Sequence, residues 1–346
     1  MEQNFILTDI MKTGYNPDLH TFLSYHTLPN QKIEFDEQFY RLHFYDLKKY
    51  TRRLACLFPR PRLYENSDYC EDLAKRMKKL ISLDFKFVIS EPWESRSTIK
   101  ERLNTLHIDH LDYTFWAGDA SWFWFLMYQK HKDKKFLFNH LDKKFDFFYL
   151  NKTSRPHRKK LFDKLYNNGI LENSLYSYTA RNITLDRKYE LPWAPMPYPP
   201  RGLDQDIYEI PYNLSAYNII SETSIDDEQF ITEKLWKPII AEQIFVVHGK
   251  PFYLKELREL GFQTFDGIID ESYDLEIDTD KRIDKIFELC KWLKTQDWRM
   301  LYAQTESIRK HNARLFFNKT ALQNSIDKTL LGLLKFFDGG QISYLL

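Results

Sequence analysis

Short apolar runs alternate with amphipathic segments along the chain, most clearly within residues 215–265. Residues 217–221 and 245–248 are apolar runs of strand length. Residues 231–241 lie between them and have a helical pattern that Thr232 can cap, and a further helix is expected from Pro251. A strand, a helix and a second strand in this order form a βαβ unit, which normally builds a parallel sheet.

The same alternation extends through the rest of the chain and predicts an α/β protein. Strands are expected at 5–7, 85–90, 112–117, 145–150 and 173–181, of which 85–90 is predicted to be buried, and helices at 72–81, 98–106 and 157–167. The chain from 281 to about 337 is predicted to be helical with a break near 295–297. The aromatic stripe at 121–130 is predicted to pack in a core or between domains, and the alternative is a platform for a sugar.

A polar, basic segment at 130–144 interrupts this pattern. A length of 346 residues favours two domains. We therefore place a boundary at this segment, with a first domain over 1–140 and a second over 141–346.

Composition narrows the class of protein. The formal net charge of +1 gives no global attraction to nucleic acid or to an acidic membrane surface. The three cysteines fit neither a disulfide framework nor a zinc pattern, and the first apolar run is too short for a signal peptide or membrane span. The expectation is a soluble cytoplasmic protein.

One local exception is the segment 47–62, where basic residues alternate with aromatic ones. We interpret it as a helix with a solvated basic face. The alternative is a surface that binds phosphate backbones or anionic glycans.

Polar side chains gather where the predicted βαβ unit has its carboxyl edge, which is where parallel sheets bind ligands. The polar ones are Glu222, Thr223, Glu233 and Lys234, and the same edge carries the aromatic Phe230. A helix N-terminus beside a lysine favours phosphate, and a carboxylate there can hold a ribose diol. The pattern indicates a nucleotide that carries a diphosphate.

A second basic group follows the predicted strand 145–150. Arg155, His157 and Arg158 stand at the start of the next helix, where arginine can grip phosphate oxygens. The alternative is that one or two of them only solvate the helix end.

Three segments resemble the α1,3/4-fucosyltransferases. FITEKLWKPIIAEQIFVVHG at 230–249 is similar to their nucleotide-sugar signature, which runs aromatic residue, Val, Thr, Glu, Lys and ends in a strand and Gly. NIISETSIDDEQ at 218–229 resembles the preceding Phe–Glu–Asn–Ser segment, and SRPHRKKLFDKLYNNG at 154–169 resembles the segment that supplies an early Arg. The likeness covers about 145–292, and the first half shows none.

The resemblance implies the GT-B architecture, in which two Rossmann-like domains face each other across a cleft. It also implies a glycosyltransferase whose donor is a nucleotide sugar, most simply a GDP-sugar such as GDP-fucose, and whose acceptor is a hydroxyl of a glycan. Arg158 would hold a phosphate, Glu233 the ribose hydroxyls and Lys234 the diphosphate, with Phe230 and Glu222 lining the site. Thr223 and Phe230 replace the usual Asn and Tyr, and Glu242–Gln243 replaces a small Ala–Gly pair, which leaves another sugar or base open.

The implied transfer is inverting and needs no metal, because Arg158 and Lys234 can stabilise the departing diphosphate. It needs a base from the first domain, for which Glu91 is the first candidate and Glu94 and Asp119 are rivals. The acidic pairs Asp204/Asp206 and Asp278/Asp280 are interpreted as loop residues and not as metal ligands.

Two alternatives stay open. The first is a glycosyltransferase that acts on modified DNA bases, motivated by segment 47–62. The second is a non-catalytic nucleotide-binding module of the same fold.

Overall fold

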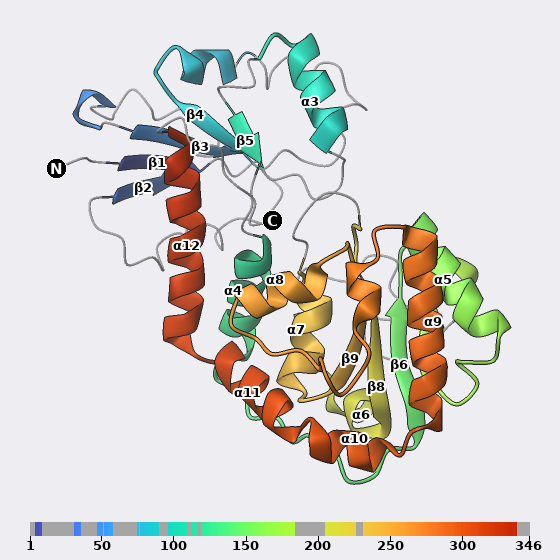
Figure 1. Ribbon diagram of the computed structural model, residues 1–346. Coiled ribbons are helices and arrows are strands. Elements are labelled where there is room, and N and C mark those ends of the chain that lie inside the picture. Colours follow the sequence, from blue (N-terminus) through green and yellow to red (C-terminus); the bar gives the residue numbers. More distant parts are fainter. Residues whose placement is uncertain are drawn as a thin grey trace. The chain divides into compact units, whose positions relative to one another are not determined.

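The computed structural model describes residues 4–8, 31–35, 47–50, 52–57, 75, 77–89, 96–108, 113–115, 119–183, 205–225 and 231–337 (Figure 1). The chain divides into two compact units. Unit 1 comprises Met1–Trp122 and Leu322–Leu346, and unit 2 comprises Phe123–Ala321. The boundary that we expected after residue 140 falls inside unit 2, between α4 (Asp119–His131) and β6 (Phe145–Asn151).

The described part of unit 1 contains a five-stranded parallel sheet in the order β2-β1-β3-β4-β5. Its strands are β1 (Asn4–Thr8), β2 (Gln31–Phe35), β3 (Arg52–Leu57), β4 (Lys86–Ile89) and β5 (Tyr113–Phe115), and its helices include α3 (Arg96–Thr105) and most of α12 (Lys319–Phe337). A 2-1-3-4-5 order is that of a doubly wound, flavodoxin-like sheet. The predicted strands 5–7, 85–90 and 112–117 correspond to β1, β4 and β5.

The helix predicted within 47–62 is wrong. The chain forms a single 3-10 turn, η2 (Leu47–Lys49), and then β3. Leu54 and Ala55 are buried, and β3 pairs with β1 on one side and β4 on the other. The side chain of Arg53 donates to the Leu47 carbonyl at 3.1 Å and to the Leu83 carbonyl at 2.7 Å, so this basic residue is used inside the unit.

The described part of unit 2 contains a four-stranded parallel sheet in the order β7-β6-β8-β9. Its strands are β6, β7 (Leu175–Tyr178), β8 (Ser215–Ser221) and β9 (Ile244–His248), and α6 (Glu209–Leu214) leads into β8. Numbered within the unit, this is again a 2-1-3-4 order. The predicted α/β class with two Rossmann-like parallel sheets is therefore confirmed for the described residues.

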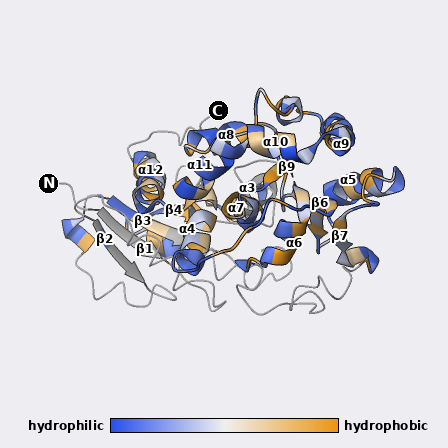
Figure 2. Ribbon diagram, turned by 90° about the horizontal axis from the view of Figure 1, so that it is seen from below, coloured by the Kyte–Doolittle hydropathy of each residue, from blue (hydrophilic) through white to orange (hydrophobic). Residues whose placement is uncertain are grey.

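Helices cover both faces of the second sheet (Figure 1). On one face α5 (Pro156–Asn167) lies against α9 (Thr279–Thr295), and Lys160 and Lys164 of α5 form ion pairs with Asp280 and Asp284 of α9. On the other face α7 (Glu233–Ile240) lies against α11 (Glu306–Phe316). Figure 2 shows β9 as hydrophobic, whereas α5 and α9 carry both hydrophilic and hydrophobic residues, as surface helices do.

The predicted βαβ unit is confirmed in detail. Every residue of β8 and of β9 is buried. Thr232 caps α7, since its hydroxyl accepts a hydrogen bond from the Lys234 amide at 3.4 Å. The helix expected from Pro251 is α8 (Tyr253–Glu259).

The C-terminal region has more breaks than predicted. After α9 come α10 (Trp298–Gln304), α11 and α12, so helix ends fall near 305 and 317–318 as well as near 295–297. Asp297 caps α10 by accepting from the Arg299 amide, and Asn318 accepts from the Ala321 amide at the start of α12. None of the described helices is long and apolar enough to span a membrane.

Candidate nucleotide site at the carboxyl edge of the second sheet

The order of the second sheet creates a topological switch point between β6 and β8. The chain leaves β6 toward β7 on one side and leaves β8 toward β9 on the other. In such sheets the crevice for a ligand lies outside the carboxyl ends of the two strands where the order reverses. Here those ends lead into the start of α5 and into Glu222 and Thr223.

Arg158 of α5 joins the two sides of this switch point. Its Nε donates to the Glu222 carbonyl at 3.0 Å, its Nη2 to Thr223 Oγ1 at 3.1 Å and its Nη1 to the Thr153 carbonyl at 3.4 Å. His157 also bonds the Glu222 carbonyl, at 3.0 Å. A guanidinium has five N–H groups, and two of those of Arg158 have no hydrogen-bond partner among the described residues.

Glu222 follows β8 directly, and its side chain is fully buried. Oε1 accepts from the Thr232 amide at 3.1 Å and from the Tyr253 hydroxyl at 2.8 Å. Oε2 accepts from Thr232 Oγ1 at 2.8 Å and from the Thr223 amide at 3.3 Å. The carboxylate thus ties the end of β8 to the first turns of α7 and α8, and it does not present a free face to a ligand.

Lys234 reaches the same point from α7. Its Nζ donates to Thr223 Oγ1 at 3.2 Å, to Thr232 Oγ1 at 3.0 Å and to Glu233 Oε1 at 2.9 Å, and it lies 3.8 Å from Glu222 Oε2. The lysine side chain as a whole is 28% exposed. Two cationic groups, from α5 and α7, therefore donate to the single hydroxyl of Thr223.

Electrostatics keep the neighbouring carboxylate charged. Burial raises the pKa of Glu233, but the ammonium groups of Lys234 and Lys237 outweigh this effect, so that the pKa lies below its ordinary value. Burial lowers the pKa of Arg158, while Glu222 raises it. Glu233 at the start of α7 is therefore an anionic acceptor at neutral pH, suitable for a pair of hydroxyl donors.

Five of the six residues predicted to bind the nucleotide come together here: Arg158, Glu222, Thr223, Glu233 and Lys234. Phe230 and the candidate bases Glu91 and Glu94 lie outside the described residues. Asp119 is the first residue of α4, and its side chain is outside the description.

Two further polar residues at this edge were not predicted. Tyr253 is bonded to Glu222, and His248 ends β9, with its ring centroid 5.5 Å from that of His157. His248 is fully buried, and neither ring nitrogen has a hydrogen-bond partner among the described residues. Burial, followed by nearby His157, Arg282 and Arg158, holds its pKa well below the ordinary value, so His248 is neutral. The position of His248 at the end of a predicted strand of the βαβ unit could have indicated that it lies at this edge of the sheet.

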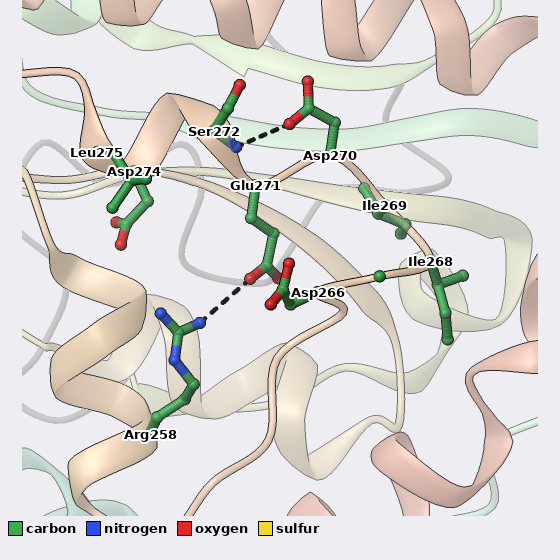
Figure 3. A pocket seen from close by; sticks show the side chains of 10 residues that line it. Arg258, Asp266, Ile268, Ile269, Asp270, Glu271, Ser272, Asp274 and Leu275 are labelled. Carbon is green, nitrogen blue, oxygen red and sulfur yellow. Dashed lines mark hydrogen bonds and ion pairs between the residues drawn. The ribbon is translucent and has the colours of Figure 1, made fainter.

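A cavity of about 480 Å³ lies in unit 2 beside the segment 266–275 (Figure 3). Arg258, Glu271 and Asp274 line it, and Arg258 forms an ion pair with Glu271. None of the five assembled site residues is among its lining residues. Asp274 Oδ1 accepts from the Leu254 amide at 3.0 Å, so the cavity adjoins the start of α8.

The acidic pair at 278 and 280 has structural roles. Asp278 caps α9, and Asp280 pairs with Lys160. Asp206 forms an ion pair with Lys130 at 2.8 Å. Within the described ranges, no group of three or more His, Cys, Asp or Glu side chains is placed to hold a metal ion.

Comparisons with known proteins bear on the fold. No protein-family model matches the chain, and no curated protein matches it. Among solved structures the chain is similar to a crystal structure of an α1,3-fucosyltransferase with GDP-fucose, at a TM-score of 0.46 and 11% sequence identity. The likeness covers 98% of this chain and 91% of that chain.

Proposed function

We propose that the protein is a glycosyltransferase of GT-B type that takes its sugar from a nucleoside diphosphate. The observation that carries the proposal is the convergence of Arg158 and Lys234 on Thr223 at the switch point of the second sheet. The cationic side chains of Arg158 and Lys234 lie near the starts of two helices, at the edge where parallel sheets bind ligands, and can bind a diphosphate there. The resemblance of segments 154–169 and 218–249 to the fucosyltransferase pattern supports the same assignment.

The donor would lie across the starts of α5 and α7. Arg158 offers its two remaining N–H groups to one phosphate, and Lys234 turns from Glu233 to the other. Glu233 then accepts from the ribose hydroxyls, with Phe230 beside the site. A GDP-sugar, with fucose or a similar sugar, is the first candidate.

The reaction proposed is an inverting transfer to a hydroxyl of a glycan. A carboxylate of unit 1 takes the proton of the acceptor, and Glu91 is proposed for this role, with Glu94 and Asp119 as rivals. Arg158 and Lys234 stabilise the charge that develops on the leaving diphosphate. These two side chains supply that charge without requiring a metal ion.

The test is a thermal-shift screen with GDP, UDP, CDP and ADP and their sugars. A ligand that binds only the folded state raises the melting temperature. We expect a shift with guanine nucleotides in the wild type and its loss in Arg158→Ala and Glu233→Ala. Lys160→Ala is the matched control, because Lys160 lies on the same helix but pairs with Asp280 outside the cluster.

Each result has a definite meaning. If a different base gives the shift, the site stands and the donor changes. If no nucleotide shifts the wild type at saturation, or if Lys160→Ala loses the shift as fully as Arg158→Ala, the proposed site is wrong. If nucleotide binds but neither transfer nor hydrolysis occurs in any condition, the protein is a binding module.

A further inference from the structure

The Glu222 carboxylate accepts four hydrogen bonds, from the starts of α7 and α8 and from its own loop. One of the four donors, Tyr253, lies 31 positions further along the chain. The Tyr253 hydroxyl donates to Oε1 at 2.8 Å, and both side chains are almost completely buried. Burial, with Glu222 as the next cause, holds the pKa of Tyr253 well above its ordinary value, so the hydroxyl keeps its proton and remains a donor.

The tyrosine ring is held in place by its surroundings. A Cβ at Gly249 would come within 2.5 Å of the Tyr253 ring, so the ring lies directly against the backbone at the end of β9. The preceding residue, Phe252, has a φ of 64°, which is a costly conformation for a bulky side chain. The Phe252 amide donates to the Asp274 carbonyl at 2.7 Å and thereby fixes this conformation.

We propose that Tyr253 is a positioning residue of the nucleotide site and acts through Glu222 on the first turn of α7. The inference rests on the proposed function. The Thr232 hydroxyl donates to Glu222 Oε2. The oxygen of this hydroxyl, Thr232 Oγ1, in turn accepts from the backbone amide and from Nζ of Lys234. The hydroxyl of Tyr253 therefore stands at one end of a continuous hydrogen-bonded chain that ends at the ammonium group.

The loss of one donor should loosen this chain without breaking it. In Tyr253→Phe, Glu222 Oε1 keeps the Thr232 amide as its one donor among the described residues, and the carboxylate gains freedom to rotate. The Thr232 hydroxyl then loses its fixed acceptor, and Lys234 loses its fixed position. The expected effect falls on binding of a diphosphate more than on the stability of the fold.

The experiment compares Tyr253→Phe with Tyr302→Phe in the full chain. The Tyr302 hydroxyl is also buried and donates at 2.7 Å to the Ala216 carbonyl, at the opposite end of β8. Two readouts are measured for each variant: the dissociation constant for GDP, and hydrogen exchange of the amides at 232–235 in the absence of nucleotide. We expect Tyr253→Phe to weaken GDP binding roughly twofold to tenfold, the range that corresponds to loss of one hydrogen bond. The same variant should speed hydrogen exchange at 232–235, whereas Tyr302→Phe should change neither readout.

A double-mutant cycle tests the route. If Tyr253 acts through Glu222, the effects of Tyr253→Phe and Glu222→Gln on GDP binding are not additive. Additive effects, or equal behaviour of the two tyrosine variants in both readouts, overturn the inference, as does faster exchange with unchanged affinity. If the wild type binds no nucleotide, the proposed function is wrong, and so is the role of Tyr253 in nucleotide binding. Hydrogen exchange then decides by itself whether Tyr253 holds the first turn of α7 in place.

Discussion

At the scale of single residues, the most informative atom of the site is the hydroxyl oxygen of Thr223. It accepts from Arg158 Nη2 at 3.1 Å and from Lys234 Nζ at 3.2 Å. A hydroxyl has two acceptor lone pairs, and both are used. This oxygen is therefore the acceptor that the two cationic side chains share.

Thr223→Val should therefore destabilise the protein although it preserves the shape of the side chain. Two charged donors lose an acceptor, and hydrogen bonds to charged groups contribute about 1.5–3 kcal/mol each. Because Lys234 is partly exposed, water replaces one bond, and we expect a loss of about 1–2 kcal/mol. Urea denaturation measures it, and Thr223→Ser is the control that should restore most of the stability. Equal stability of the Val variant and the wild type would contradict this account.

Sequence reasoning reached the residues of the site whose position follows from local order. Glu222 follows a buried strand, and Glu233 and Lys234 follow a capping threonine, so each could be placed at the carboxyl edge. Tyr253 could not be found in this way, since its bond to Glu222 spans 31 positions and depends on how α8 returns to the sheet. The inward role of Glu222 was missed for the same reason, because all that a sequence shows is a carboxylate after a strand.

At the scale of elements, three helices of unit 2 meet in an aromatic cluster. Trp124 of α4, Trp236 of α7 and Phe316 of α11 have ring centroids 5.7–6.3 Å apart. Both tryptophans are fully buried. They differ in one respect: the Trp124 indole donates to the Phe316 carbonyl at 2.8 Å, whereas that of Trp236 has no hydrogen-bond partner among the described residues.

This difference predicts unequal effects of the same substitution. Trp124→Phe and Trp236→Phe both lose ring volume, but only the first also breaks a buried hydrogen bond. We expect Trp124→Phe to be less stable than Trp236→Phe by about 1 kcal/mol. Denaturant titration of both variants gives the comparison. A Trp236 variant that is as unstable as the Trp124 variant would show that the hydrogen bond does not decide the cost.

The segment that precedes α9 carries a predicted dependence of stability on pH. Burial raises the pKa of Glu271 from 4.5 to about 6. The folded state therefore binds this proton more tightly than the unfolded state, so the contribution to stability is full below pH 4.5 and is lost as the pH rises through about 6. The shift corresponds to at most about 2 kcal/mol.

Glu271→Gln should remove this contribution and flatten the free energy of unfolding between about pH 4.5 and 6. Glu276→Gln is the control, because its lysine partner, Lys285, holds the pKa of Glu276 below 4.5, outside this window. Urea denaturation at several pH values measures the free energy of unfolding of each variant. If the pH dependence of the unfolding free energy is unchanged in Glu271→Gln, or changes equally in Glu276→Gln, Glu271 is not the source of that pH dependence.

Elements were predicted where the local pattern and the tertiary environment agree. β8, α7 and β9 show this agreement. The two apolar runs of the sequence are buried strands, and the predicted capping residue Thr232 does stand at the start of α7. The segment around β3 shows the opposite case. Its basic residues suggested a solvated helix, but the run from Leu54 to Leu57 is short and pairs on both sides, which favours a central strand. The extra helix ends near 305 and 317–318 were missed because Thr305 and Asn318 give only weak local signals.

At the scale of the whole molecule, the two sheets repeat one strand order, in which the chain starts near the middle and builds outward in both directions. The alternation of strands and helices predicted the parallel class for both. It could not predict that the C-terminal residues from Leu322 belong to the first unit, since nothing in a helical pattern specifies which sheet it will join.

The division into compact units makes a final prediction about where donor binding resides. Residues 119–321 retain the whole of α4, all four strands of the second sheet and the five assembled site residues. A unit with its own sheet and core can fold alone. We expect this fragment to unfold cooperatively and to bind GDP about as tightly as the full chain, as measured by calorimetry. Arg158→Ala in the fragment is the control that must abolish binding. A folded fragment that has lost GDP affinity would place part of the donor site in unit 1, and a fragment that does not fold would show that the second sheet depends on the rest of the chain.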